Sequence, residues 1–323
     1  MEQKKIPDFS NKTRSEVPKP NTWSVEDLYA DRSAWETDKT KAQQMIDEIG
    51  DKRKNWMRSA RSVKTLLDFL TEIDRLLTRT YTYASLKSDT EMSHSGHISD
   101  KGEIHSAFIN YSAQTTFLEA DILKLGRTRI REFLEKEVGL AVYKKFFDSI
   151  FRLRKHILDE KRSWIVSQTG LFSSAPEKAA SMLDNVDIPS PRFELKGGET
   201  VELNIANYVK YRRSPDVDTR RGVMECYWKN HSKFKNTFAV LLDSAVKQHL
   251  FQSRVHNYPD TLEAVLYPKK IDRKVYTNLI ETVRDNLTPL HRYLELKKRL
   301  LNLKELEYGD IYASSIPAVD VSY

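Results

Sequence analysis

The chain has 323 residues, room for about two domains of ordinary size, and its 39% hydrophobic and 31% charged residues are typical of a globular protein. Glycine and proline number only 10 and 11, which predicts an all-α fold of mostly long helices, since these residues interrupt helices. No run approaches the roughly 20 apolar residues of a membrane helix. No apolar segment of a signal peptide follows Met1, and the single Cys226 excludes an internal disulfide. We therefore expect a cytoplasmic protein without a membrane partner.

The first 21 residues are polar and carry three prolines, which predicts an extended arm over residues 1–21. Residues 22–190 are expected to form a helical region. Its first signals are an N-cap at Ser24, with Trp23 and Leu28 as a hydrophobic staple, and a capping box that begins at Ser33. Apolar residues then recur every three or four positions, as on one face of a helix. They form two stripes: Trp35, Ala42, Met45, Ile46 and Ile49, ended by Gly50, and Leu66, Phe69, Leu70, Ile73, Leu76, Leu77 and Tyr81, opened by Ser62.

Less regular segments complete this region. We expect a loop or loose helix over Ser88–Ser99, a helix from about Asp100, helical stretches at Arg129–Glu137 and Leu140–Trp164, a break at Gly170–Pro176 and a last helical piece at Pro176–Asn185. The net charge is +7, and the densest basic patch runs from Val142 to Trp164, with Phe146, Phe147, Phe151 and Trp164 among its lysines and arginines. Because these aromatic residues follow helical spacing, we expect them to be buried rather than to stack on nucleic-acid bases. No nucleic-acid partner is predicted.

Residues 191–323 begin with the one strong strand signal. Arg192–Leu195 and Thr200–Leu203 alternate apolar and polar residues around Gly197-Gly198, which predicts a β-hairpin over 192–203 with a two-residue turn and a positive φ at one or both glycines. Asn204 should cap a short helix, and Ser214-Pro215 should open a long helix that runs to about Arg254. A last long helix should begin at Ile271-Asp272 and kink at Pro289.

The sequence contains no self-sufficient active site, so no catalytic, cofactor-binding or metal-binding residue is assigned. None of the eight histidines is followed by Glu, so the His-Glu-x-x-His zinc helix is absent. His94, His97 and His105 lie closest together, and we expect them to be solvent-exposed polar residues rather than metal ligands. Cys226 is expected to be a buried, unreactive thiol. Neither a Gly-x-Ser-x-Gly nucleophile motif nor a phosphate-binding loop is present.

Several segments, in order, resemble bacterial oligoendopeptidase F. They are Arg14–Pro18, Thr22–Tyr29, Glu177–Leu183, Phe193–Leu203, Tyr211–Arg221, Lys233–Ala239, Tyr276–Ile280, Leu290–Lys297 and Tyr308–Pro317. The resemblance spans nearly the whole chain. It implies a member of the thimet-oligopeptidase superfamily, zinc metallo-endopeptidases that cut short peptides in a deep cleft of a helical shell. In that family a His-Glu-x-x-His helix and a later Glu bind zinc, which polarises the scissile carbonyl.

The chain resembles the N-terminal half of this family and ends at Tyr323, before the zinc motif. We therefore expect residues 191–323 to be the hairpin and first helices of a truncated peptidase domain. The resemblance implies zinc in the intact enzyme, with ligands outside this chain, short peptides as substrates, the missing C-terminal half as a partner, and an inactive 323-residue chain. The helices after Ser214 should expose an apolar face where that half would pack. The alternatives are a non-catalytic helical scaffold or peptide-binding protein of the same fold and, less favoured, a nucleic-acid-binding helical protein.

Overall fold

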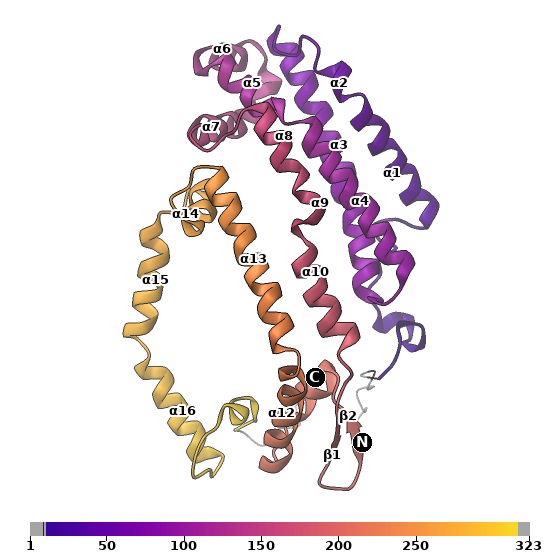
Figure 1. Cartoon of the computed structure of the whole chain (residues 1–323), viewed down its shortest axis with the longest axis vertical. Helices are drawn as coiled ribbons and strands as arrows, with labels where there is room; N and C mark the ends of the chain where they lie inside the picture. Colours follow the sequence, from indigo (N-terminus) through magenta and orange to yellow (C-terminus); the bar gives the residue numbers. More distant parts are fainter. Residues whose placement is uncertain (1–8, 10, 316–323) are drawn as a thin grey trace. The chain divides into compact units, whose positions relative to one another are not determined.

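The computed structural model describes residue 9 and residues 11–315; the expectations for the rest of the N-terminal arm and for Ile316–Tyr323 fall outside these residues. Helices dominate the described chain, and its single sheet has two strands, which confirms the all-α prediction with one short hairpin (Figure 1). The chain divides into two compact units. We call Val17–Met182 with Asp243–Lys270 the helical unit. We call Leu183–Leu242 with the described parts of Met1–Glu16 and Ile271–Tyr323 the hairpin unit.

The helical unit holds most of the helices. They are α1 (Arg32–Asp47), α2 (Ile49–Lys52), α3 (Ala60–Thr90), α4 (Ser95–Gln114), α5 (Phe117–Leu125), α6 (Arg127–Lys136), α7 (Lys144–Leu153), α8 (Glu160–Gln168), α9 (Gly170–Ser173), α10 (Ala175–Met182) and α14 (Thr261–Leu266). The hairpin unit contains β1 (Arg192–Glu194), β2 (Thr200–Glu202), α11 (Ile205–Tyr211), α12 (Val217–Ser232), α15 (Arg273–Asp285), α16 (Thr288–Leu300) and the 3-10 helix η6 (Tyr308–Tyr312). α13 (Lys235–Val255) begins in the hairpin unit and ends in the helical unit.

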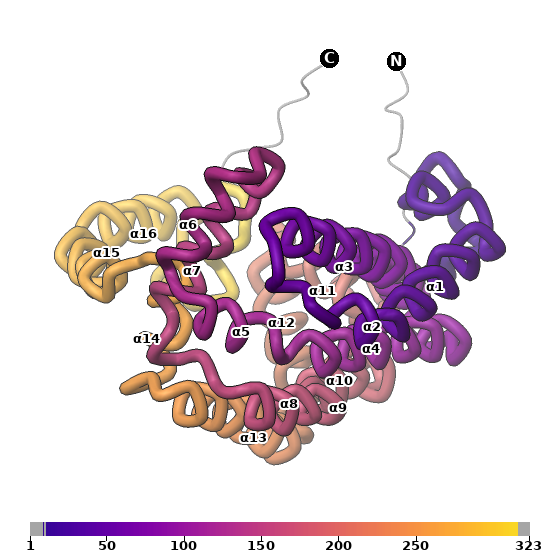
Figure 2. Tube along the Cα trace, turned by 90° about the horizontal axis from the view of Figure 1, so that it is seen from above, coloured from indigo at the N-terminus to yellow at the C-terminus, as the bar shows by residue number. Residues whose placement is uncertain are grey.

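The core of the helical unit lies where α1, α3 and α4 pack side by side (Figure 2). The predicted stripes of α1 and α3 form this core: Trp35, Ile46, Ile73 and Leu76 are each at most 1% exposed. The indole N–H of Trp35 donates to the carbonyl oxygen of Thr80 at 3.0 Å, so the ring's polar atom is satisfied inside the core. α8 packs along α4 and adds the next layer.

Several local predictions for the helical unit are wrong. Trp23 is 84% exposed and forms no staple, because the first α-helix begins only at Arg32, where the Asp31 carboxylate accepts from the amide of Ala34. The helix predicted from about Asp100 begins earlier, because α4 starts at Ser95 with His94 as its N-cap. The preceding helix, α3, continues to Thr90. The Leu140–Trp164 stretch is interrupted between α7 and α8, and Gly170–Pro176 holds α9 and the start of α10 rather than a break.

The basic, aromatic stretch of this unit behaves largely as predicted. Phe147 and Phe151 are 1% and 7% exposed and Phe146 packs partly buried against the core, so these rings are not free to stack on bases. Trp164 is the exception, since it is 51% exposed. The prediction of buried aromatic residues is therefore confirmed for α7 and wrong for α8.

The hairpin is confirmed, with Phe193 opposite Val201 and Glu194 opposite Thr200. Its loop has three residues instead of two: the Leu195 amide donates to the Glu199 carbonyl, the Gly198 amide donates to the Leu195 carbonyl, and Gly198 has φ +83°. This geometry is a turn followed by a left-handed glycine. The hairpin packs on α12 where Phe193 approaches Gly222, at which an added Cβ would lie 2.8 Å from the ring.

The long helices predicted for the hairpin unit are each divided in two. α12 is capped by Asp216, whose carboxylate accepts from the Thr219 amide, so Pro215 lies outside the helix, and the predicted run to Arg254 is interrupted before α13. α15 ends at Asp285. Pro289 then lies in the first turn of α16, where a missing N–H is tolerated, and it starts a helix instead of kinking one. Asn204 caps α11 as predicted.

A buried ion pair holds η6 against α12. Arg220 and Asp310 are 1% and 0% exposed, and the guanidinium Nε of Arg220 donates to Asp310 at 2.6 Å. Arg221 Nη2 and the amide of Glu307 donate to the other carboxylate oxygen at 2.6 and 2.9 Å. Burial alone would raise the pKa of Asp310, but these donors outweigh it and hold the pKa below its ordinary value.

Within the described residues, no helix is long and apolar enough to cross a membrane.

Candidate functional site

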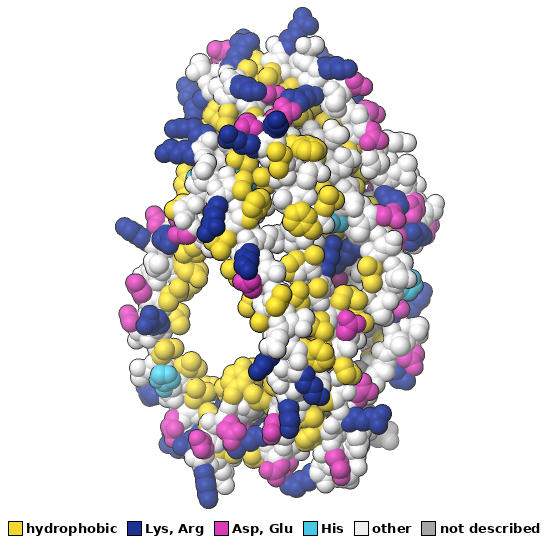
Figure 3. All heavy atoms as spheres, in the orientation of Figure 1, with side chains coloured by type: hydrophobic (Ala, Val, Ile, Leu, Met, Phe, Trp, Pro, Cys, Tyr) yellow, Lys and Arg dark blue, Asp and Glu magenta, His cyan; other side chains and the backbone are white. Residues whose placement is uncertain are grey.

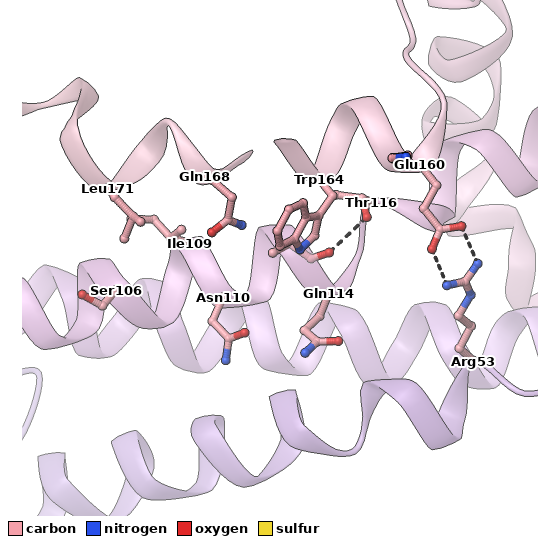
Figure 4. Close-up of a pocket in the computed structure, with 12 residues that line it drawn as sticks. Arg53, Ser106, Ile109, Asn110, Gln114, Thr116, Glu160, Trp164, Gln168 and Leu171 are labelled. Carbon is pink, nitrogen blue, oxygen red and sulfur yellow. Dashed lines mark hydrogen bonds and ion pairs between the residues drawn. The ribbon is translucent and has the colours of Figure 1, made fainter. Parts of the chain in front are cut away.

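A pocket of about 760 Å³ lies in the helical unit, between α4 and the segment α8–α9. Ser106, Asn110 and Gln114 are spaced four apart on α4, and Trp164 and Gln168 are spaced four apart on α8, so each helix presents one row of side chains to it. Figure 4 shows the ion pair of Arg53 and Glu160 at one end of the pocket and Leu171 at the other.

The pocket wall mixes apolar side chains, such as Ile109 and Leu171, with polar and charged ones. The Arg53 guanidinium donates to both oxygens of Glu160, at 2.5 and 2.8 Å, and these bonds hold the pKa of that carboxyl below its ordinary value. The amides of Asn110 and Gln114 have no hydrogen-bond partner among the described residues, and each carries both donors and an acceptor. Trp164 adds an exposed ring. Such a wall can bind an uncharged chain of alternating donors and acceptors, which is the pattern of a peptide main chain.

A second surface lies in the hairpin unit and is apolar. We call it the α15–α16 face, made of Val275, Leu279 and Val283 on α15 and Leu290, Tyr293 and Leu300 on α16. These side chains are 50–62% exposed, and no residue of α15 is buried. Figure 3 shows hydrophobic side chains gathered over both helices. The apolar face predicted after Ser214 is thus present and uncovered on α15 and α16, whereas on α12 Val223 and Tyr227 are buried, at 0% and 8% exposed.

The comparisons with known proteins point to one family. Residues 121–189 match the family model described as Oligopeptidase F, and residues 210–320 match the model of peptidase family M3. The chain is 27% identical over 299 residues to oligopeptidase PepF of Bacillus subtilis (strain 168), covering 93% of this chain and 45% of that protein. The chain belongs to the oligoendopeptidase F family of M3 peptidases.

Further matches agree with this family. The group B oligopeptidase PepB of Streptococcus agalactiae is 26% identical over 310 residues, which is 96% of this chain and 51% of that protein. The crystal structure of oligoendopeptidase-F from Enterococcus faecium superposes with a TM-score of 0.84 at 26% identity, over 88% of this chain and 56% of that one. The chain therefore spans about half the length of the relatives it matches.

The histidines singled out in the sequence lie in the helical unit and have local structural contacts. The ring of His94 accepts from the amide of His97, and the two rings stack at 4.0 Å between centroids. Burial and the neighbouring His94 lower the pKa of His97. His105 Nε2 lies 3.3 Å from the carbonyl oxygen of Gly170. No group of three or more His, Cys, Asp or Glu side chains converges in the described part of the chain, so these donors do not fit the zinc of an M3 peptidase.

Cys226 is half-buried, and its thiol donates to the Arg192 carbonyl at 3.7 Å, so it contacts the hairpin. Apart from Trp164, which was expected to be buried, the pocket residues of α4 and α8 were not singled out from the sequence. The sequence does show polar side chains at the four-residue spacing of positions 106, 110 and 114. Polar residues at helical spacing usually face solvent, so this spacing alone does not predict a pocket. Only the packing of α8 on α4 makes them the wall of a pocket.

Proposed function

We propose that this chain is the cleft-forming part of a zinc metallo-endopeptidase that hydrolyses short peptides, with the zinc ligands and the general base outside this sequence. The α15–α16 face carries the proposal. It lies within the residues that match peptidase family M3, and the matched relatives are about twice as long as this chain. A contiguous apolar patch of more than a few hundred Å² is unusual on a monomer and indicates a missing partner. The remaining half of the enzyme is the partner we assign to it.

The division of labour follows from the side chains present. The sequence has no His-Glu-x-x-His, and the described residues bring no zinc-ligand set together. When zinc is bound elsewhere in the enzyme, it supplies the polarised carbonyl and the activated water. This chain contributes walls that bind and orient a peptide, such as the amides of Asn110 and Gln114, and an apolar face that holds the catalytic half.

Activity measurements test this division of labour. The 323-residue chain should not hydrolyse a quenched fluorogenic peptide. The same chain joined to the part of Bacillus subtilis PepF that it does not match should give turnover that a chelator abolishes. Leu279→Glu should reduce that turnover because it places a charge in the α15–α16 face, whereas Thr277→Glu, on the opposite side of α15, should not.

Two results would contradict the proposal. Chelator-sensitive turnover by the 323-residue chain alone would place the catalytic site within it. A joined protein that folds and binds peptide but never turns it over would favour a non-catalytic scaffold of the same fold.

The exposure of the α15–α16 face can also be measured directly on the 323-residue chain by itself. We expect the chain to bind a hydrophobic dye or to self-associate in analytical ultracentrifugation, and Val275→Glu with Leu279→Glu to reduce both signals several-fold. Thr277→Glu serves again as the matched control. If the chain is monomeric, silent toward the dye and unfolds in one sharp transition, the α15–α16 face needs no partner.

A further inference from the structure

Arg212 of the hairpin unit lies between two tyrosine rings. It follows Tyr208 by one helical turn at the end of α11, and its guanidinium carbon is 5.3 Å from the centre of that ring. The ring of Tyr312, at the end of η6, is closer, with its centre 3.9 Å from the same carbon. Tyr308 lies one turn earlier on η6, with its hydroxyl 3.4 Å from that of Tyr312. We call these four residues the Arg212 site.

The rings of this site are held in place by their neighbours. Tyr208 is 3% exposed, stacks on Tyr227 at 4.2 Å, and accepts a hydrogen bond from the indole of Trp228 at 3.0 Å. Tyr312 is positioned through η6, which the buried Asp310 ties to α12. Lys297 also holds η6 in place, since its ammonium group donates to the Ile311 carbonyl at 2.7 Å. The guanidinium of Arg212 is therefore oriented before any ligand arrives.

Arg212 has no anionic partner among the described residues, in contrast with the arginines near it. Arg220 and Arg221 both donate to Asp310. The Nε atom of Arg212 is buried without a hydrogen-bond partner, while its two terminal nitrogens are not among the buried unpaired atoms. A partly desolvated guanidinium without a carboxylate is costly, and contact with aromatic rings offsets only part of that cost. The arrangement is thus suited to an anion that comes from outside the described chain.

We propose that Arg212 binds the C-terminal carboxylate of a peptide. A planar guanidinium forms paired hydrogen bonds with a carboxylate, and the hydroxyls of Tyr308 and Tyr312, 3.4 Å apart on η6, leave one further donor on the element that carries the Tyr312 ring. Tyr308 is 62% exposed, so its ring can contact the last side chain of the peptide. The choice of a peptide as ligand rests on the proposed function. A chain terminus is present on every short peptide and is rarely available inside a folded protein, so this anchor favours oligopeptides as substrates.

Direct binding to the 323-residue chain tests the anchor without any catalysis. The probes are penta-alanine labelled with a fluorophore at its N-terminus, the same peptide as a C-terminal amide, and an amide whose last residue is glutamic acid. Fluorescence anisotropy should show the free acid bound roughly 10- to 100-fold more tightly than the plain amide, the usual effect of losing hydrogen bonds to a charged group. Arg212→Gln should abolish this preference, and Arg212→Lys should restore it only in part because an ammonium group lacks the planar fork.

Arg213→Gln is the matched control, since Arg213 is the adjacent residue and is exposed. It should leave the preference unchanged. Equal binding of acid and amide to the unaltered chain, or no binding of either, overturns the anchor, and this comparison needs no variant to fold. A glutamyl amide that binds as tightly as the free acid overturns the assignment to the chain terminus. None of these results affects the proposed function, which fails instead if the chain alone turns over peptide or the α15–α16 face needs no partner.

Discussion

α3 of the helical unit and α15 of the hairpin unit both carry an apolar residue every three or four positions, yet their surroundings differ. Along α3, residues such as Val63, Ile73 and Leu76 are at most 1% exposed because α1 and α4 pack against them. Along α15 no residue is buried, and Leu279 is 62% exposed. The pattern in the sequence thus identifies an apolar face, but whether that face is buried depends on which other helices pack against it.

The strongest test of this comparison asks whether the hairpin unit has a folded centre of its own. Asp310→Asn removes the charge that neutralises the buried Arg220 while keeping the side-chain shape. We expect a loss of about 3–5 kcal/mol in the free energy of unfolding, because a buried charge is left without its partner. Urea unfolding followed by circular dichroism measures it. Asp285→Asn, an exposed aspartate of α15, is the control and should change little. A small effect of Asp310→Asn would mean that the hairpin unit does not unfold cooperatively around this ion pair and that α15 is exposed for that reason.

The ion pair of Arg220 and Asp310 also predicts that the free energy of unfolding depends on pH. The pKa of Asp310 is lowered in the folded chain, so its stabilising effect is present above the ordinary aspartate pKa of about 3.9 and is lost as the pH falls through the lower folded value. The difference in stability between the unaltered chain and Asp310→Asn should therefore be constant near neutral pH and shrink below about pH 4. Urea unfolding at pH 7 and pH 3 measures this difference, and an equal difference at both would contradict the assigned ionisation.

A pair of matched substitutions compares the two helices directly. Leu76→Ala on α3 should cost about 2–5 kcal/mol, since it leaves a cavity in a packed core. Leu279→Ala on α15 should change the stability of the 323-residue chain by about 0.5 kcal/mol or less, because the side chain is already in water. Both can be measured by urea unfolding. A large loss for Leu279→Ala would show that α15 is covered in solution.

The sequence predicts the stripes of α1 and α3, the cap at Asn204 and the hairpin, because each depends on residues close together in the chain. It fails where two local signals compete. Ser24 and Ser33 are both predicted as N-caps, but the structure caps α1 with Asp31 and places Ser33 inside the helix. Pro289 is compatible with a kink or with a helix start, and the structure has the start.

The candidate sites were less predictable than the fold. The pocket and the Arg212 site depend on contacts between segments far apart in sequence, such as Arg53 with Glu160 and Arg212 with Tyr312. No spacing rule within one segment brings these residues together. The apolar face was predictable because it follows helical periodicity within α15 and α16 alone.

The smallest predicted effect concerns the covered part of the hairpin unit, where Val201 of β2 is 8% exposed and packs with Leu203 and Tyr208. Gly198 has φ +83°, a conformation that costs other residues about 1–2 kcal/mol, whereas Gly197 is not in that region and has open space where an added Cβ would lie. Gly198→Ala should therefore lower the free energy of unfolding by about 1 kcal/mol. Gly197→Ala should be neutral or stabilise by a few tenths of a kcal/mol, because it restricts the unfolded chain. Urea unfolding of the two single variants side by side measures the contrast. Equal effects at both positions would mean that the loop relaxes to a different turn, and that even the covered part of this unit is less fixed than the core around α3.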